Sequence, residues 1–486
     1  MNSSNNLNAL EKPIFLLAFS ALVSVFLMPM VQVFPNGILE DDGYIYAQIA
    51  YNIATLGAST FDGINITSGY HLLWGGILSI ISLIVTVFTD GKFAHLFLLV
   101  LFNIIIYVAV SWRMFDQNLE RLGAFIFFLM SSLIMETILL STLFLVIASR
   151  FLNGEGDFGD SWVDLLFIFL IPLTRIDSSV VIGVISLYFL IYNRTIFVRI
   201  IAALLLGVAA QFLTMYALFG ELVSVSSFLK ISDTGVFQGD FQQVLHNIAG
   251  SKSQLVRFMA VLVLVGLAAI NIRRTAERDV KFRKITLLLA ILAFFAPPFV
   301  LIGTRSWYLL PVHLVLFFIA TRPDIESRGA KMQKSMTNGF AILMCATYLA
   351  GATMYHHKYR IDQTNSANFV KTLKYTTPKG APIFLIDGSG FIGYFSPNPL
   401  INGDGLVNSY AYARRLRDNA LGGYLVDHKI CWVIANRRGR SHGDIVDFHG
   451  LVIRKIDTEL LSRVPDDGIN AYTNYRLFRL RRQDCR

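Results

Sequence analysis

The stretch DDGYIYAQIAYNIATLGASTFDGINITSGYHLLW, residues 41–74, follows a long apolar run and opens with clustered carboxylates. With Glu40, just before it, Asp41 and Asp42 make three consecutive acids. One Asp at a helix start can cap free N–H groups and meet the positive end of the helix dipole. Capping accounts for one acid, but three adjacent carboxylates repel one another. The cluster is therefore typical of a general base or a cation site, with capping alone as the alternative.

The residues after the acids have a helical repeat. Ile45, Ile49 and Ile53 recur at four-residue spacing, which predicts an amphipathic helix. A helix of this kind fits the plane of a membrane interface. The polar, glycine-rich second half of the stretch ends at His71 and Trp74, where the next apolar segment begins. Trp74 fits an interfacial anchor, whereas His71 is either an interfacial hydrogen-bonding group or a substrate contact.

Composition places the chain in a membrane. Its 486 residues are 54% hydrophobic and 15% charged, whereas soluble domains carry roughly 25% charged residues. Apolar segments lie near 14–34, 72–88, 94–112, 122–149, 162–173, 178–193, 198–219, 255–272, 285–303, 307–320 and 337–355. Since 122–149 is long enough to be a broken pair, the sequence predicts a mainly α polytopic protein with 11 or 12 transmembrane helices. The first segment lacks a small-residue cleavage site and is interpreted as an uncleaved anchor.

Basic residues fix the expected orientation. They are dense in the loops over residues 273–284 and 322–334, which are therefore predicted to be cytoplasmic. Counting from these loops places the N-terminus inside, and the first loop, the TRID break at 174–177 and the chain beyond 355 outside. We expect a multi-pass membrane protein. The net charge of +9 then records loop orientation, and no nucleic-acid partner is expected.

The C-terminal region has a different pattern. APIFLID and KICWVIAN are strand-like, with a helical stretch over residues 409–425 between them, which predicts a small extracytoplasmic α/β domain. The predicted division is a transmembrane catalytic module over 1–355, with loops at 35–71 and 220–254, and this domain over 356–486. Cys431 and Cys485 can pair only if the domain is extracytoplasmic.

Gly388, Gly390 and Gly393 spell G-x-G-x-x-G after the first of these strands. A dinucleotide fingerprint also needs a following helix and an acid about 20 residues later. Here Pro397 follows closely, Asp404 comes too early, and an outward domain would not meet NAD. A glycine-rich turn is the preferred interpretation.

The stretch 41–74 resembles the first extracytoplasmic loop of GT-C glycosyltransferases, polytopic enzymes that take sugars from polyprenyl-phosphate donors. The likeness is greatest to bacterial arabinofuranosyltransferase-like members with a DD-x-Y…A-x-N…G…F…G-Y…LW pattern. It extends to METILL (135–140), RID (175–177), RSWYLLP (305–311) and IDGSGFIGYFSPNPLINGDGLVN (386–408). The resemblance implies a catalytic acid at the start of the loop helix, which matches Asp42 best and Asp41 next. It also implies a location in the bacterial inner membrane.

Glu136 is a candidate site residue independently of this resemblance, because placing a carboxylate at mid-membrane costs about 2.5–3.5 kcal/mol of insertion free energy. It indicates either a site or a chain break that brings the carboxylate to water, with pairing to an Arg as the structural alternative. The resemblance implies that Glu136 is the second acidic position. Asp41, Asp42 and Glu136 could together hold Mg²⁺ or Mn²⁺, although acids alone do not establish a metal.

Donor-phosphate binding requires cations. Arg305, beside two aromatic residues at the outer face, can donate two parallel hydrogen bonds to a phosphate and is the first candidate. Arg175 is a further candidate whose alternative is pairing with Asp177. The remaining donor-binding candidates are Lys230, Tyr308, His71 and Tyr44.

The expected function is transfer of a sugar, with arabinofuranose as the first choice, from a polyprenyl-phosphate donor to an extracytoplasmic glycan or a pilin-like protein. Asp42 is the expected base, and direct displacement inverts the anomeric centre. A lipid-linked glycan flippase or transporter, and a glycan ligase or polymerase, are the alternatives.

Overall fold

In the computed structural model, the larger described stretches are residues 41–115, 134–153, 158–231, 252–302, 306–322, 366–385, 388–418 and 420–436. Shorter described pieces are 39, 120–121, 124, 335–336, 339–340, 343, 440–442, 444–448, 451–452 and 475–479. The chain forms two compact units. The first comprises Met1–Met28, Leu101–Gln211 and Gly239–Thr353, and the second comprises Pro29–Val100, Phe212–Gln238 and Met354–Arg486.

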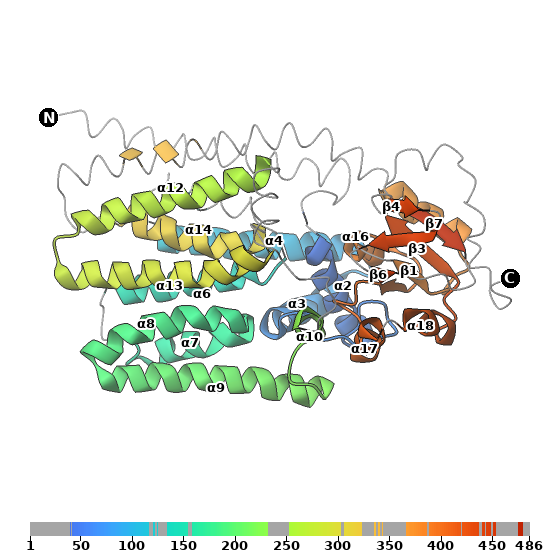
Figure 1. Ribbon diagram of the computed structural model, residues 1–486, viewed down its shortest axis with the longest axis horizontal. Coiled ribbons are helices and arrows are strands. Elements are labelled where there is room, and N and C mark those ends of the chain that lie inside the picture. The colour runs from blue at the N-terminus through green and yellow to red at the C-terminus, as the bar shows by residue number, and fades with distance from the viewer. Residues whose placement is uncertain are drawn as a thin grey trace. The chain divides into compact units, whose positions relative to one another are not determined.

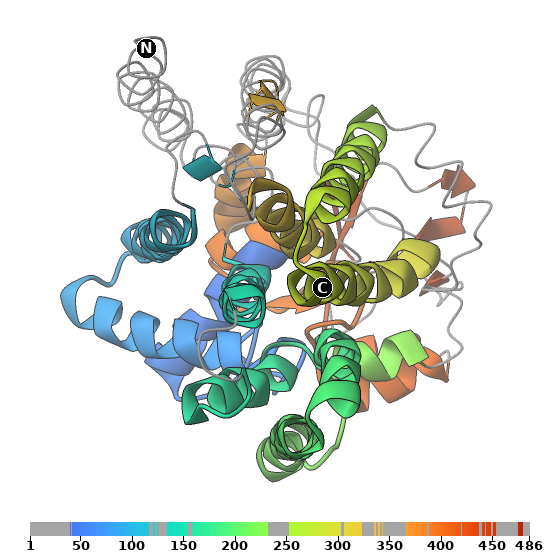
Figure 2. The same cartoon turned by 90° about the vertical axis from the view of Figure 1, so that its left-hand side faces the viewer.

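The first unit is a helical bundle, viewed along its helices in Figure 2. Its helices are α6 (Thr137–Asn153), α7 (Trp162–Thr174), α8 (Ser179–Tyr192), α12 (Lys252–Arg274), α13 (Arg278–Ile302) and α14 (Ser306–Thr321). Within it, α14 packs on α6, α12 and α13, and α13 also packs on α6 and α8. Most of α4 (Lys92–Met114) and α9 (Arg194–Phe219) also belongs to this unit.

Two of the described helices, α4 and α9, are long and apolar enough to cross a membrane. Shorter apolar helices include α3 (Leu72–Phe88), α6 and α7. The mainly helical fold is as predicted, and the count of 11 or 12 spans stays a prediction.

The long apolar segment over 122–149 is interrupted, as its length suggested. A turn occupies residues 134–136, and α6 begins at Thr137. Ile134 has φ 63°, a left-handed conformation that a β-branched side chain rarely adopts. The chain therefore changes direction just before Glu136, which places this carboxylate at a helix start and not in the middle of a helix.

The second unit is built on a four-stranded sheet in the order β2-β1-β3-β7 (Figure 1). Its strands are β1 (Ile383–Leu385), β2 (Leu400–Asn402), β3 (Trp432–Asn436) and β7 (Tyr475–Arg479). β1 pairs in parallel with β2 and β3, and β7 pairs antiparallel to β3. The remaining strands, β4 (Arg440–His442), β5 (Asp444–Phe448) and β6 (Leu451–Val452), form an antiparallel sheet. The expected alternation of strands and helices is thus present.

Helices from distant parts of the sequence cover both faces of the four-stranded sheet. On the face of Phe384, Val225 and Leu229 of α10 (Val225–Ile231) pack with α17 (Tyr410–Arg417) and α18 (Leu421–Asp427). On the face of Ile383, the covering elements are α2 (Asp41–Leu56), α16 (Ser389–Phe395) and a helix over residues 366–376. The first loop is therefore part of the same core as the C-terminal sheet.

The isoleucine stripe of α2 faces this core. Ile45 and Ile49 are buried against the sheet, and Ile53 packs at the edge of the same cluster. The periodicity predicted the helix correctly, whereas its placement in a membrane interface stays a prediction. The apolar face is covered by protein.

Candidate active site

Asp41 joins α2 to the helix α16 of the C-terminal region. Its Oδ1 accepts a hydrogen bond from the backbone N–H of Gly390 at 2.8 Å, near the start of α16. A Cβ on residue 390 would lie 2.1 Å from the backbone oxygen of Asp41, so this approach requires glycine. Asp41 therefore fixes the first turn of α2 against α16.

The G-x-G-x-x-G glycines serve this packing. Gly388 precedes α16 with φ 70°, and a Cβ on Gly393 would lie 2.4 Å from the ring of Phe61. A short helix does follow the strand, which corrects the expectation that Pro397 prevents one. Since the Asp41 carboxylate accepts from Gly390 N–H, it takes the position a pyrophosphate would need, and repulsion disfavours an anion there.

Asp42 follows Asp41 in the first turn of α2, next to the contact between Asp41 and Gly390, and is half-buried. Tyr44, two residues on, is 3% exposed. Its ring contacts Phe391 edge-on at 5.4 Å and Phe395 at 6.4 Å between centroids. The Tyr44 ring thus packs against these two phenylalanine rings, which argues against a contact between Tyr44 and the sugar donor. Packing on both sides of Asp42 holds the local backbone in place.

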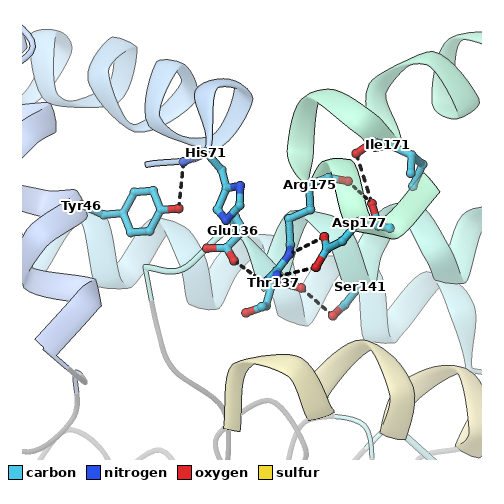
Figure 3. A network of polar contacts seen from close by, with 9 residues as sticks. Tyr46, His71, Glu136, Thr137, Ser141, Ile171, Arg175 and Asp177 are labelled. Atoms are coloured by element: carbon cyan, nitrogen blue, oxygen red, sulfur yellow. Dashed lines mark hydrogen bonds and ion pairs between the residues drawn. The ribbon is translucent and has the colours of Figure 1, made fainter. Parts of the chain in front are cut away.

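His71 precedes α3, and its backbone N–H donates to the Tyr46 hydroxyl at 3.2 Å (Figure 3). The side chain is half-exposed. Trp74 is 1% exposed, so it is a core residue and not the expected interfacial anchor.

The glycine-rich half of the loop is held by its own polar groups and by the C-terminal helices. The Asn52 amide donates to the carbonyls of Thr60 (2.8 Å) and Phe61 (3.1 Å). Tyr424 of α18 donates to Asn65 Oδ1 at 3.2 Å. Burial, followed by the charge of Asp62, raises the pKa of Tyr424 to about 12, so this hydroxyl stays a donor at neutral pH. The recurrent polar residues of the loop are thus largely structural.

Glu136 forms a buried ion pair in the first unit (Figure 3). Arg175 Nη1 donates to Glu136 Oε1 at 2.9 Å, while its Nε and Nη2 bind the two Asp177 oxygens at 3.1 and 2.8 Å. Glu136 and Arg175 are almost fully buried, and Asp177 is exposed. Both structural alternatives, Glu136 with an Arg and Arg175 with Asp177, are present at once.

This ion pair lies at one end of the bundle. It links the start of α6 to the break between α7 and α8, whereas Arg150 and Asp164 pair at the other ends of α6 and α7. That second end also carries the basic loop over residues 273–284. There Lys284 donates to Asn271 Oδ1 at 2.6 Å and to the carbonyl of Arg322 at 2.9 Å. Glu136 and the basic loop over residues 273–284 therefore lie at opposite ends of the first unit.

Comparison with solved structures identifies the fold. ArnT from Cupriavidus metallidurans, a GT-C glycosyltransferase solved in the apo state, matches with a TM-score of 0.51 at 12% identity. The match covers 88% of this chain and 93% of ArnT. The chain has the GT-C fold.

A second likeness is to the archaeal oligosaccharyltransferase AglB from Archaeoglobus fulgidus, solved with an inhibitory peptide and a dolichol-phosphate. Its TM-score is 0.47 at 12% identity, covering 88% of this chain and 69% of AglB. No family model and no curated protein sequence matches the chain.

The other cation candidates are only partly placed. Arg305 lies outside the described residues. Lys230 lies in α10 and Tyr308 in α14, and the described residues do not include their side chains. Of the four cationic or aromatic candidates beyond the first loop, Arg175 is the one whose contacts are placed, and two carboxylates hold it.

The metal prediction has limited support in the described part of the chain. No group of three or more His, Cys, Asp or Glu gathers there as a metal site. Asp41 already accepts an N–H, and Glu136 is paired with a guanidinium. These two carboxylates act as hydrogen-bond and ion-pair partners.

Sequence reasoning missed a buried cluster at the start of α4. Lys92 Nζ donates to Gln48 Oε1 at 3.0 Å and to the carbonyl of Tyr394 at 2.6 Å. His95 bridges the Tyr394 hydroxyl and the Ser82 hydroxyl, at 2.7 Å each. A Lys and a His one turn apart at a helix start were the available signal. The cluster fastens α2, α3, α4 and α16 together.

Proposed function

We propose that this protein is a membrane glycosyltransferase that transfers a sugar from a polyprenyl-phosphate donor to an extracytoplasmic acceptor. The observation that carries the proposal is the placement of Asp42. This acid is half-buried in a turn held by the Asp41–Gly390 contact on one side and the buried Tyr44 ring on the other. The GT-C fold supports the same activity.

Asp42 is proposed as the general base. It takes the proton of the acceptor hydroxyl while the acceptor oxygen bonds to the anomeric carbon. The bond from that carbon to the phosphate oxygen breaks, and polyprenyl phosphate leaves as an anion that needs no protonation. Attack from the face opposite the leaving group inverts the anomeric centre.

The leaving phosphate needs positive charge. We propose Arg305 first and Lys230 next for this role. Arg175 is reassigned, because its guanidinium already binds Glu136 and Asp177. Its proposed function is to hold Glu136 at the end of the bundle opposite the basic loops, where Glu136 contacts the acceptor or the donor. His71, half-exposed at the start of α3, remains a proposed donor contact.

The proposed location is the inner membrane, with the basic loops inside and the C-terminal region outside. Cys431 is disulfide-bonded, and its partner lies outside the described residues. Disulfides persist in oxidising compartments, which agrees with an extracytoplasmic C-terminal region. The proposed acceptor is an envelope glycan or a pilin-like protein, and arabinofuranose is the first sugar to test, before hexoses.

Turnover of a defined donor tests the proposal. Purified protein is supplied with polyprenyl-phosphate arabinofuranose or hexoses and an extract of envelope acceptors. A transferase releases polyprenyl phosphate and labels the acceptor. A flippase moves the donor across a vesicle without releasing polyprenyl phosphate, and a ligase uses a preassembled lipid-linked glycan. Absence of release with every donor, from protein that is folded by thermal melting, contradicts the proposal.

A further inference from the structure

A groove runs along the second half of α4, within the first unit. Its apolar wall consists of Ile104, Ile105, Val108, Ala109 and Trp112. These positions recur at the spacing of a single helical stripe. The groove has a volume of about 840 Å³, within the roughly 300–1,000 Å³ that ligand sites in proteins occupy. Ile105, Ala109 and Trp112 are exposed, so the groove opens to the surroundings of the bundle.

Two basic residues line the groove at the end of α4. Arg113 follows Trp112 and is exposed. The Arg121 guanidinium lies 4.1 Å from the centre of the Trp112 ring, and its Nε donates to the carbonyl of Phe115 at 2.8 Å. These contacts fix the Arg121 head group beside the groove. The acid next to it in the chain, Glu120, is buried and does not line the groove, so the charged groups of the described lining are both cations.

The basic end of the groove lies with the basic loop over residues 273–284. The Phe115 ring, just past α4, contacts the ring of Phe318 near the end of α14 at 5.9 Å between centroids. Asn271, near the end of α12, donates to the carbonyl of Ala320 at 3.3 Å. The end of α4, the end of α14 and the basic loop therefore share one end of the bundle. In the proposed orientation this end is cytoplasmic.

Exposed tryptophans indicate where the membrane surface crosses this end. Trp112 is 56% exposed, and Trp162, which begins α7, is 73% exposed. The start of α7 lies at the same end, where Asp164 pairs with Arg150. Trp side chains gather at the level of the lipid head groups, and α4 is long and apolar enough to cross the hydrocarbon. The groove thus has its arginines at the head-group level and its apolar wall in the hydrocarbon.

This combination selects an amphiphile with an anionic head. A guanidinium pairs with phosphate through charge-assisted hydrogen bonds, and basic pockets on the cytoplasmic side of membrane helices bind anionic lipid head groups. A free phosphate ion would leave the apolar wall uncovered. A choline head group would bring a second cation close to the guanidinium groups, and like charges repel.

We propose that the groove on α4 binds one anionic phospholipid of the inner leaflet. Its phosphodiester meets Arg113 and Arg121, and an acyl chain lies along Ile105 and Ala109. This lipid is not a substrate, because the groove and Glu136 lie at opposite ends of the first unit. The assignment to the inner leaflet rests on the proposed orientation, whereas the selectivity for an anionic head group does not. A ligand that binds the folded state alone stabilises it, so this lipid also stabilises the protein.

Lipid titration followed by native mass spectrometry tests the site. Full-length protein is delipidated in detergent and titrated with phosphatidylglycerol or phosphatidylcholine of matched acyl chains. We expect one tightly bound phosphatidylglycerol and only weak, unselective binding of phosphatidylcholine. Arg113→Gln should weaken the tight binding by about 10–100-fold, the range for loss of a hydrogen bond to a charged group. Arg273→Gln makes the same change of charge at an exposed position in the basic loop and should bind like the parent protein. Equal binding of the two lipids, or equal effects of the two variants, would overturn the proposal.

Filling the groove tests the acyl-chain contact and leaves both arginines in place. Ala109→Trp occupies the exposed apolar wall, so added phosphatidylglycerol should no longer raise its thermal unfolding midpoint. Leu206→Trp on α9, at a position that is 63% exposed, is the matched control and should keep the full rise. A rise in Ala109→Trp equal to that of the control contradicts the site. Displacement of the bound lipid by polyprenyl phosphate, but not by a second anionic phospholipid, would assign the groove to the polyprenyl chain and overturn the proposal as well.

Discussion

At the scale of single residues, two adjacent carboxylates have different surroundings. Asp41 accepts a hydrogen bond from the backbone of α16, which explains its position without a catalytic role. Asp42 follows it in a turn that Asp41 and Tyr44 hold in place. General bases work best when their backbone is preorganised in this way. The opening cluster of acids thus separates into a positioning residue and a proposed base.

Replacing Asp42 tests the base. Asp42→Asn keeps the size of the side chain, and Asn caps a helix as well as Asp does. It cannot take a proton, so we expect turnover to fall by about 10²–10⁴-fold, the usual contribution of general-base catalysis. The measurement is sugar transfer by purified variants with matched thermal stability.

Asp41→Asn is the matched control, because its amide oxygen can still accept from Gly390 N–H. We expect a much smaller loss than for Asp42→Asn. If Asp42→Asn keeps near-wild-type turnover, or if Asp41→Asn loses as much, the roles of the two acids are assigned wrongly.

The tight contact at Gly390 makes a second prediction. Gly390→Ala places a Cβ 2.1 Å from the Asp41 carbonyl oxygen, so backbone has to shift. Overpacking typically costs about 1–3 kcal/mol, and we expect at least that loss of stability. The thermal unfolding midpoint of purified protein measures it. Gly76→Ala, at an exposed position of α3, meets nothing within 4 Å and should leave the midpoint unchanged or slightly raised. Equal midpoints for the two variants would contradict a tight contact between Asp41 and Gly390.

At the scale of elements, a buried ion pair joins two chain breaks. Arg175 lies between α7 and α8, and Glu136 lies between the turn at 134–136 and α6. Removing one partner of a buried pair typically costs about 3–5 kcal/mol, because the other charge stays buried alone. We therefore expect Arg175→Met to lower thermal stability strongly, because it removes the guanidinium that pairs with the buried Glu136. Glu136→Gln should cost less, because Arg175 keeps its ion pair with Asp177.

The double variant distinguishes a structural role of this ion pair from a direct role of Glu136 in sugar transfer. Glu136→Gln with Arg175→Met leaves neither charge, so we expect most of the lost stability to return. Transfer activity should stay low if Glu136 contacts donor or acceptor, as proposed. Recovery of both stability and activity would assign the pair a structural role alone. Failure of the double variant to regain stability would show that the two charges are not coupled.

Periodicity predicted helices well, but it did not predict what covers them. The stripe of Ile45 and Ile49 in α2 and the apolar segment of α3 have sequences that fit a membrane equally well. The stripe of α2 is covered by protein because of long-range contacts, such as those of Ile45 and Ile49 with the C-terminal sheet, that no local pattern encodes. The sequence predicts a break near Glu136, because a carboxylate in an apolar run is costly, but it gives the structural partner of Glu136 only as an unspecified Arg.

At the scale of the whole molecule, the first loop and the C-terminal sheet share one hydrophobic core. Strands and helices of the C-terminal region could be predicted from their local patterns. The contribution of Ile45, Ile49 and Phe61 to the sheet could not, since more than 300 residues separate them from Ile383. The division into 1–355 and 356–486 stays a prediction about sequence domains. The core itself contains residues from both sides of that boundary.

The last prediction follows from this shared core and concerns removal of the C-terminal region. A chain cut after residue 355 keeps Asp42, every apolar segment and both basic loops, so a self-sufficient catalytic module would retain transfer. The core predicts the opposite. Without β1 and α16, the buried faces of α2 and Phe61 are exposed, and Asp41 loses the Gly390 N–H. We expect residues 57–71 of the truncated protein to be cleaved rapidly by added protease, and transfer to be abolished. Full-length Gly76→Ala serves as the folded reference. A truncated protein with a protected first loop and undiminished turnover would show that the C-terminal sheet is dispensable for holding Asp42.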